Sequence, residues 1–114
     1  KTVSDRDIAL PDGTGDADYL AALAPALDEV LTHFRPELVI YLAGADPHEG
    51  DRLGRLSLTF DGLAQRDAMV LRACRDQRIP VAIAMAGGYG HDINDTVAIH
   101  ATTLRTAARL FRST

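Results

Sequence analysis

An acidic loop that carries a histidine directly follows an apolar run, and its side chains could hold a metal ion. The run 38–43 is apolar throughout, which predicts a buried strand. The first carboxylate after it, Asp46, is then placed where the strand gives way to a loop. In open α/β sheets, ligands bind in the crevice at the carboxyl ends of the strands. The loop is therefore a candidate metal site.

A tyrosine follows a second apolar run in the same way. Residues 81–86 predict another buried strand, and Gly87, Gly88 and Tyr89 come directly after it. Two strands joined by a helical crossover run parallel, so we expect Asp46 and Tyr89 to face one crevice. A tyrosine hydroxyl can donate to the oxyanion that forms when water attacks a metal-polarised carbonyl, and the glycines allow the backbone to approach a ligand closely. The pair indicates metal-assisted hydrolysis of an acyl group.

Simpler explanations exist for both loops, because an aspartate or a Gly-Gly-Tyr sequence after a strand commonly forms only a turn or a cap. The familiar phosphate-binding motifs fail: Gly88-Tyr89-Gly90 lacks the third glycine of a dinucleotide site, and 50–55 lacks the Gly-Lys ending of a phosphate loop. A nucleotide-binding α/β protein is therefore the weakest alternative. A calcium loop starting at Asp46 fails because its twelfth position is Ser57.

Two helices are predicted around the first strand. The first runs from about Asp16, with apolar residues at spacings of three and four, and Pro25 is expected to kink it or to start a second helical piece. The second runs from Asp61, as its N-cap, to about Arg78. Their apolar positions are Leu20, Leu23, Leu27, Leu31 and Phe34 in the first helix, and Leu63, Val70, Leu71 and Cys74 in the second.

A third helix begins near Asn94 or Asp95 and completes the pattern of elements. We expect its buried stripe to consist of Val97, Ala101, Leu104, Ala108 and Phe111. Both predicted strands are apolar without alternation, as in a parallel sheet covered on both faces. Two strands and three helices cannot close such a core. The predicted fold class is therefore α/β, part of a three-layer parallel sheet with flanking helices, incomplete without an N-terminal portion.

Composition narrows the class of protein further. The 114 residues are 46% hydrophobic and 25% charged, which is typical of one soluble domain. The formal net charge of −4 gives no reason to expect binding to nucleic acid or to a membrane. The only cysteine, Cys74, excludes an internal disulfide and a cysteine-based zinc site, and it favours a reducing, cytoplasmic location.

Three runs of sequence carry a resemblance to the histone deacetylase family. Residues 41–59 resemble the family's zinc-ligand loop, 85–89 resemble its glycine-glycine-tyrosine loop, and 8–16 are typical of bacterial and class IV members. The resemblance spans nearly the whole chain in the same order. It implies the arginase-deacetylase fold, with residues 1–114 as the C-terminal part of a single α/β domain.

The resemblance also implies roles for individual residues. Asp46 would be a zinc ligand, and Tyr89 would stabilise the tetrahedral intermediate. Leu53 would line the tunnel that admits an acyl-lysine side chain, with Gly87 and Gly88 in its wall and floor. Members of this family hydrolyse N-acetyl-lysine or related acylamides with zinc-activated water. The implied substrate is therefore an acylated lysine or polyamine, and the implied cofactor is zinc (Zn).

Other parts of the family's site have no match in this sequence. The family needs an Asp-x-His pair in addition to the lone aspartate, and its general base is one of two adjacent histidines, whereas no His-His pair occurs here. His48 follows Asp46 at the right spacing, but Asp46 aligns with the lone ligand, so we expect His48 to be a loop residue. The chain alone should be inactive, with the N-terminal portion of the same protein supplying the rest. The alternative is a non-catalytic α/β fragment or interaction module.

Overall fold

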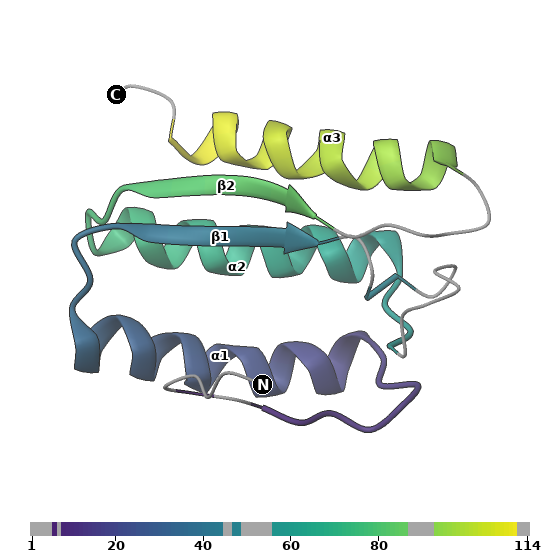
Figure 1. Ribbon diagram of the computed structural model, residues 1–114, viewed down its shortest axis with the longest axis horizontal. Helices are drawn as coiled ribbons and strands as arrows, with labels where there is room; N and C mark the ends of the chain where they lie inside the picture. The colour runs from purple at the N-terminus through teal and green to yellow at the C-terminus, as the bar shows by residue number, and fades with distance from the viewer. Residues whose placement is uncertain (1–5, 7, 45–46, 49–55, 87–92, 112–114) are drawn as a thin grey trace.

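Three helices and two strands alternate along the chain in a computed structural model, which describes residues 6, 8–44, 47–48, 56–86 and 93–111 (Figure 1). The elements are α1 (Asp16–Phe34), β1 (Val39–Gly44), α2 (Phe60–Asp76), β2 (Val81–Ala86) and α3 (Ile93–Leu110). The predicted strand-helix-strand unit is confirmed, and so is the α/β class.

The two strands pair in parallel from their first residues to their last. Val39 is opposite Val81, and Gly44 is opposite Ala86. Helix α2 crosses behind the sheet, while α1 runs along the β1 side and α3 along the β2 side (Figure 1). Both outer helices contact α2. Because the strands end at paired residues, the chain leaves both of them at the same edge of the sheet.

The core lies where α2 meets its neighbours. One cluster at the N-terminal end of α2 joins Leu58 and Leu63 to Ile99 of α3. A second cluster joins Leu31 of α1 to Cys74 and Ile79. Burial of these side chains, at roughly 1.5–3 kcal/mol each, is the main force that holds α1 and α3 against α2.

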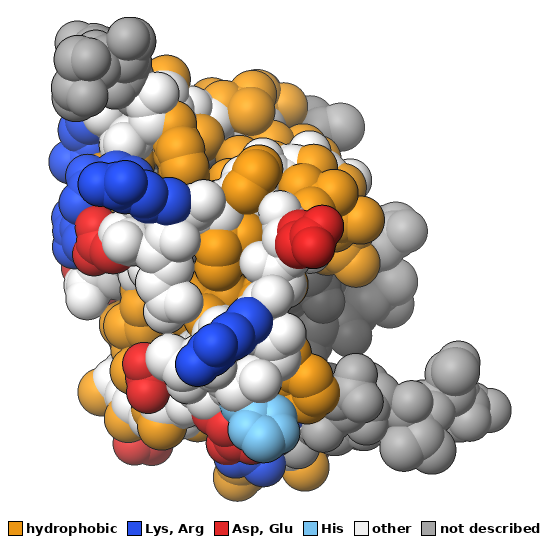
Figure 2. Space-filling view, turned by 90° about the vertical axis from the view of Figure 1, so that its left-hand side faces the viewer, with side chains coloured by type: hydrophobic (Ala, Val, Ile, Leu, Met, Phe, Trp, Pro, Cys, Tyr) orange, Lys and Arg blue, Asp and Glu red, His pale blue; other side chains and the backbone are white. Residues whose placement is uncertain are grey.

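One face of the sheet is open in the part of the chain that the structure describes. Along β1, Ala43 is fully buried, whereas Ile40 and Leu42 are 67% and 65% exposed. Ala82 and Ala84, their partners in β2, lie on the same face. Seen from the end where the strands begin, hydrophobic side chains lie at the surface among charged ones (Figure 2). The open face agrees with the expectation that these two strands are only part of a larger sheet.

The apolar stripe predicted for the last helix is also exposed, contrary to expectation. Val97 and Leu104 are 60% and 55% exposed. Helix α3 packs instead with the face that carries Ile99 and the two threonines Thr103 and Thr106, which are buried. On this face Ile99 joins the apolar cluster with Leu58 and Leu63, and Thr103 donates a hydrogen bond to a buried carboxylate of α2.

Two details of the helices bear on the sequence prediction. Pro25 lies inside the single helix α1, so it does not start a second helical piece. The N-cap of α2 is Thr59, whose Oγ1 accepts a hydrogen bond from the amide of Gly62 at 3.0 Å, and Asp61 lies in the first turn. Aspartate is favoured at both positions, at the cap by its side-chain oxygen and in the first turn by the helix dipole, so its presence does not fix the helix start.

Candidate functional site

The five predicted site residues all fall outside the residues that the structure describes, so their placement stays a prediction: Asp46, Leu53, Gly87, Gly88 and Tyr89. The strand ends that precede them are described. Gly44 stands two residues before Asp46 in the sequence, and Ala86 directly precedes Gly87. Since Gly44 and Ala86 are partners in the parallel sheet, the two predicted loops start side by side.

A buried arginine of α2 reaches this edge of the sheet. Arg66 is 3% exposed, and its Nη1 donates to the carbonyl oxygen of Gly44 at 2.6 Å. Its Nε and Nη2 donate to Oδ1 of the neighbouring Asp67, at 3.1 and 2.9 Å. One guanidinium therefore connects the last residue of β1 to a buried carboxylate.

That carboxylate is itself held by two other elements. The hydroxyl of Tyr41, in β1, donates to Oδ1 of Asp67, and the hydroxyl of Thr103, in α3, donates to Oδ2. Asp67 is 1% exposed. A buried charge is tolerated only when it is paired and hydrogen-bonded, and both oxygens of Asp67 meet that condition. The network joins β1, α2 and α3 directly behind the edge of the sheet.

Burial and the neighbouring groups shift the pKa of two members of this network. Burial raises the pKa of Tyr41 well above its usual range, Arg66 opposes the change, and the nearby Asp67 adds to it. Burial by itself lowers the pKa of Arg66, but Tyr41 and Asp67 outweigh it, so the net pKa is raised. The guanidinium carbon lies 5.7 Å from the centre of the Tyr41 ring, close enough for a cation–π contact. Tyr41 therefore stays a neutral donor and Arg66 a cation at physiological pH.

The chain that follows the predicted metal loop is fastened to the start of α1. The amide of Ser57 donates to the carbonyl oxygen of Thr14 at 2.8 Å. Asp16 accepts from the amide of Thr59 at 2.9 Å and from its hydroxyl at 2.5 Å. The hydrogen bond from Arg66 to Gly44 holds the backbone before the segment that contains Asp46 and Leu53. The contacts of Ser57 and Thr59 hold the backbone after it.

His48 has a packing role in the structure, as expected for a loop residue. It is 7% exposed, and its ring centre lies 4.6 Å from that of Phe60. Its backbone forms an isolated parallel β-bridge with Leu58. Within the described ranges, no group of three or more His, Cys, Asp or Glu side chains could hold a metal ion. Asp46 lies outside these ranges, so the zinc site predicted from the sequence stays a prediction.

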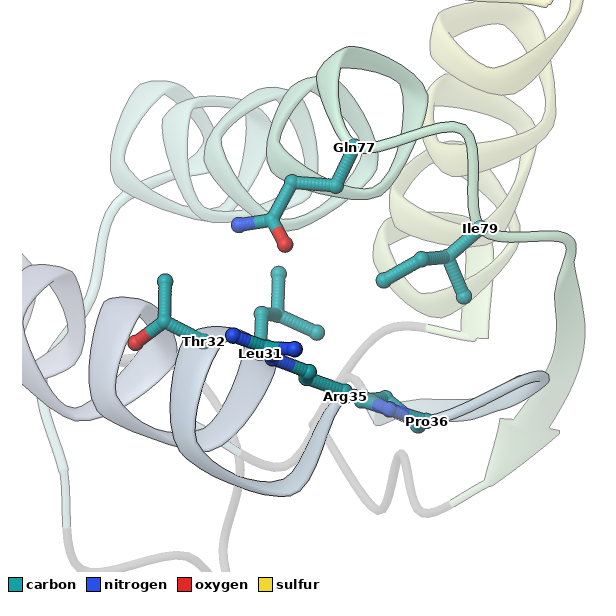
Figure 3. A pocket seen from close by; sticks show the side chains of 6 residues that line it. All are labelled: Leu31, Thr32, Arg35, Pro36, Gln77 and Ile79. Carbon is teal, nitrogen blue, oxygen red and sulfur yellow. The ribbon is translucent and has the colours of Figure 1, made fainter.

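A surface pocket of about 360 Å³ lies at the other end of the molecule (Figure 3). Its lining comes from the C-terminal ends of α1 and α2 and the segments that follow them: Leu31, Thr32, Arg35, Pro36, Gln77 and Ile79. The strands begin at this end, whereas the predicted site lies where they finish. The pocket is therefore separate from the candidate site.

In the part of the chain that is described, no helix is long and apolar enough to cross a membrane.

The fold places the chain among the α/β proteins with parallel strands, a class in which ligands commonly bind at the carboxyl ends of the strands. Residues 2–105 match the model of the histone deacetylase domain, and the chain belongs to that family. The resemblance seen in the sequence is thereby confirmed.

Individual relatives agree with this assignment. An uncharacterized protein from Picosynechococcus is 42% identical over 97% of this chain. Histone deacetylase 2 of Arabidopsis thaliana is 41% identical over 75% of it. The crystal structure of acetylpolyamine aminohydrolase from Burkholderia pseudomallei covers 91% of the chain with a TM-score of 0.76 at 24% identity, which shows the shared fold. The chain spans 37%, 22% and 28% of these proteins, respectively.

Sequence reasoning missed the buried network entirely. Arg66 and Asp67 occupy positions three and four residues after Leu63, inside the apolar stripe of α2 that continues with Val70 and Leu71. Charged residues at such positions are the available signal, because a helix with one buried stripe places them in the core. Their presence there indicates polar partners in the core. In the structure the partner of Arg66 is the carbonyl of Gly44, and Asp67 accepts from Tyr41 and Thr103.

Proposed function

We propose that the protein to which this chain belongs is a zinc-dependent amide hydrolase that removes an acetyl or related acyl group from a lysine or polyamine. The observation that carries the proposal is the pairing of Gly44 with Ala86 at the ends of two parallel strands. It supports a shared crevice for the loops that follow, in a chain that belongs to the histone deacetylase family.

Asp46 is proposed as one zinc ligand. A carboxylate oxygen is a donor that zinc accepts, and catalytic zinc sites use three protein ligands and leave one position for water or substrate. The bound ion supplies a Lewis acid that lowers the pKa of its water. This chain contributes one of the three ligands.

Tyr89 is proposed as the donor that stabilises the oxyanion. Its phenol, held in the loop after β2, would donate a hydrogen bond to the oxygen that gains charge as water attacks the acyl carbon. Leu53, Gly87 and Gly88 are proposed to line the tunnel that admits the acylated side chain. The adjacent strand ends support this division, because one loop carries the metal ligand and its neighbour carries the donor.

The remaining ligands and the general base are proposed to come from an N-terminal portion of the same protein. The exposed apolar side chains support such a partner, since Ile40, Leu42 and Val97 are each at least 60% exposed and isolated domains rarely leave so much apolar surface uncovered. A further layer of chain over these faces would cover the apolar groups. It could also supply a partner for Nδ1 of His100, which is buried and has no hydrogen-bond partner among the described residues.

Deacetylation by the full-length protein tests the proposal. An acetyl-lysine peptide and an N-acetylated polyamine serve as substrates, before and after removal of metal by a chelator. We expect turnover that the chelator abolishes and added zinc restores. A full-length protein that binds no zinc and releases no acetate would contradict the proposal and favour the non-catalytic interaction module.

A further inference from the structure

We infer that Arg66 is a positioning residue, which fixes the end of β1 and thereby the chain that leads to Asp46. The inference rests on the proposed function, since it concerns the loop that carries the proposed zinc ligand. Its structural basis is the contact between Nη1 of Arg66 and the carbonyl oxygen of Gly44, at 2.6 Å.

The contact acts on the backbone directly. A hydrogen bond from a guanidinium to a carbonyl oxygen is charge-assisted, and such bonds are shorter and stronger than neutral ones. A peptide group is planar, so fixing the carbonyl of Gly44 also fixes the orientation of the peptide bond that follows it. Asp46 is two residues further along the sequence. The direction in which the chain leaves the sheet is therefore set by Arg66.

The rest of the network holds the guanidinium in place. Asp67 accepts two of its hydrogen bonds and is anchored in turn by Thr103 of α3 and by Tyr41 of β1. Because Tyr41 and Gly44 belong to the same strand, Arg66 and Asp67 tie the final part of β1 to α2 at two points. The arrangement is a clamp on the strand end rather than a single bond.

A second pair in the same helix shows what is special about Arg66. Arg75 also donates from Nε and Nη2 to the aspartate that follows it, at 3.3 and 3.1 Å. That pair is exposed, at 43% and 61%, whereas the side chains of Arg66 and Asp67 are 4% and 1% exposed. A buried ion pair is seldom more stabilising than apolar residues of the same size. Net stability therefore does not explain two charges in the core, whereas control of the Gly44 carbonyl does.

The test compares Arg66→Gln and Arg66→Lys with two controls in the full-length protein. Arg75→Gln is the matched exposed control. Leu31→Ala removes a buried side chain in the cluster with Cys74 and Ile79, where the strands begin, and lowers stability without touching the network. The first measurement is zinc affinity, from competition with a chelator. The second is hydrogen exchange at the backbone amides of residues 41–44.

We expect Arg66→Gln to weaken zinc binding on the order of 10–100-fold, as loss of groups that orient a metal ligand does. Relative to the unmodified protein, hydrogen exchange should become faster at residues 41–44 by more than in the rest of the sheet. Arg66→Lys should have a smaller effect, because an ammonium lacks the planar fork that serves Asp67 and Gly44 together. Both controls should leave zinc affinity unchanged. Arg75→Gln should also leave exchange unchanged, whereas any faster exchange in Leu31→Ala should extend over the whole sheet and not be confined to residues 41–44.

Unchanged zinc affinity in a folded Arg66→Gln protein would overturn the inference. So would an equal loss of affinity in Leu31→Ala, because the effect would then follow stability alone. If Arg66→Gln does not fold, Arg66→Lys decides on the same two measurements. If the unmodified protein binds no zinc, the proposed function fails, and exchange at residues 41–44 in the Arg66 variants still supports or overturns the clamp.

Discussion

Asp16, the first residue of α1, accepts hydrogen bonds from both the amide and the hydroxyl of Thr59, the N-cap of α2. The contact leaves no room beside it: a Cβ added at Gly62 would lie 1.9 Å from Oδ1 of Asp16. Two helix starts that are 43 positions apart in the sequence are thereby joined through one carboxylate. The joint lies at the end of the segment that contains the proposed metal ligand.

We expect Gly62→Ala to destabilise the full-length protein by about 1–3 kcal/mol, as overpacking does. The same change should cost less in an Asp16→Ala background, since the carboxylate that the new methyl group meets is gone. Chemical unfolding of the two single variants and the double variant measures the coupling. Additive effects of the two changes would show that Gly62 is required for some other reason.

A second prediction concerns the open face of the sheet. If a further portion of the protein covers β1, Leu42→Ala in the full-length protein should cost about 2–5 kcal/mol, as in a buried core. Leu42 is 65% exposed in this structure, and truncation of a side chain left in that state should change stability by no more than about 0.5 kcal/mol. The free energy of unfolding separates the two cases. A small cost would contradict the proposed cover.

The strands and helices were predictable because their signals are local. The runs 38–43 and 81–86 are each preceded closely by a proline, Pro36 or Pro80, and their apolar residues show no helical period. The structure shifts the first strand by one residue, to Val39–Gly44, and confirms the second at Val81–Ala86. The order of elements then follows from their spacing.

The orientation of α3 was not predictable in the same way. A sequence shows that Val97 and Leu104 share a helix face, but not which neighbouring element that face meets. The face that packs carries Ile99, which contacts Leu58 and Leu63, and Thr103, which contacts Asp67 across 36 positions of sequence. The site residues Asp46 and Tyr89 rest on motif resemblance, and their geometry stays a prediction.

The raised pKa of Tyr41 predicts a loss of stability at high pH. Unfolded tyrosine ionises near pH 10, whereas the folded protein holds Tyr41 neutral to a higher pH. The unfolded state therefore releases a proton first, and the contribution of Tyr41 is present below about pH 10 and declines above it. Tyr41→Phe should be less stable at pH 8 but should lose stability less steeply between pH 9.5 and 11. Urea unfolding across about that range tests this, and equal slopes for the two proteins would contradict it.

The roles proposed for Asp46 and Tyr89 predict two different failures. In the full-length protein, Asp46→Ala should lose zinc, because one of about three protein ligands is removed. Tyr89→Phe should retain zinc, and its kcat should fall on the order of 10²–10³-fold, the effect of removing one oxyanion donor. Metal analysis and steady-state kinetics on an acetyl-lysine peptide measure both. Near-normal turnover in Tyr89→Phe would show that the oxyanion is stabilised by another group, and full zinc occupancy in Asp46→Ala would remove Asp46 from the ligand set.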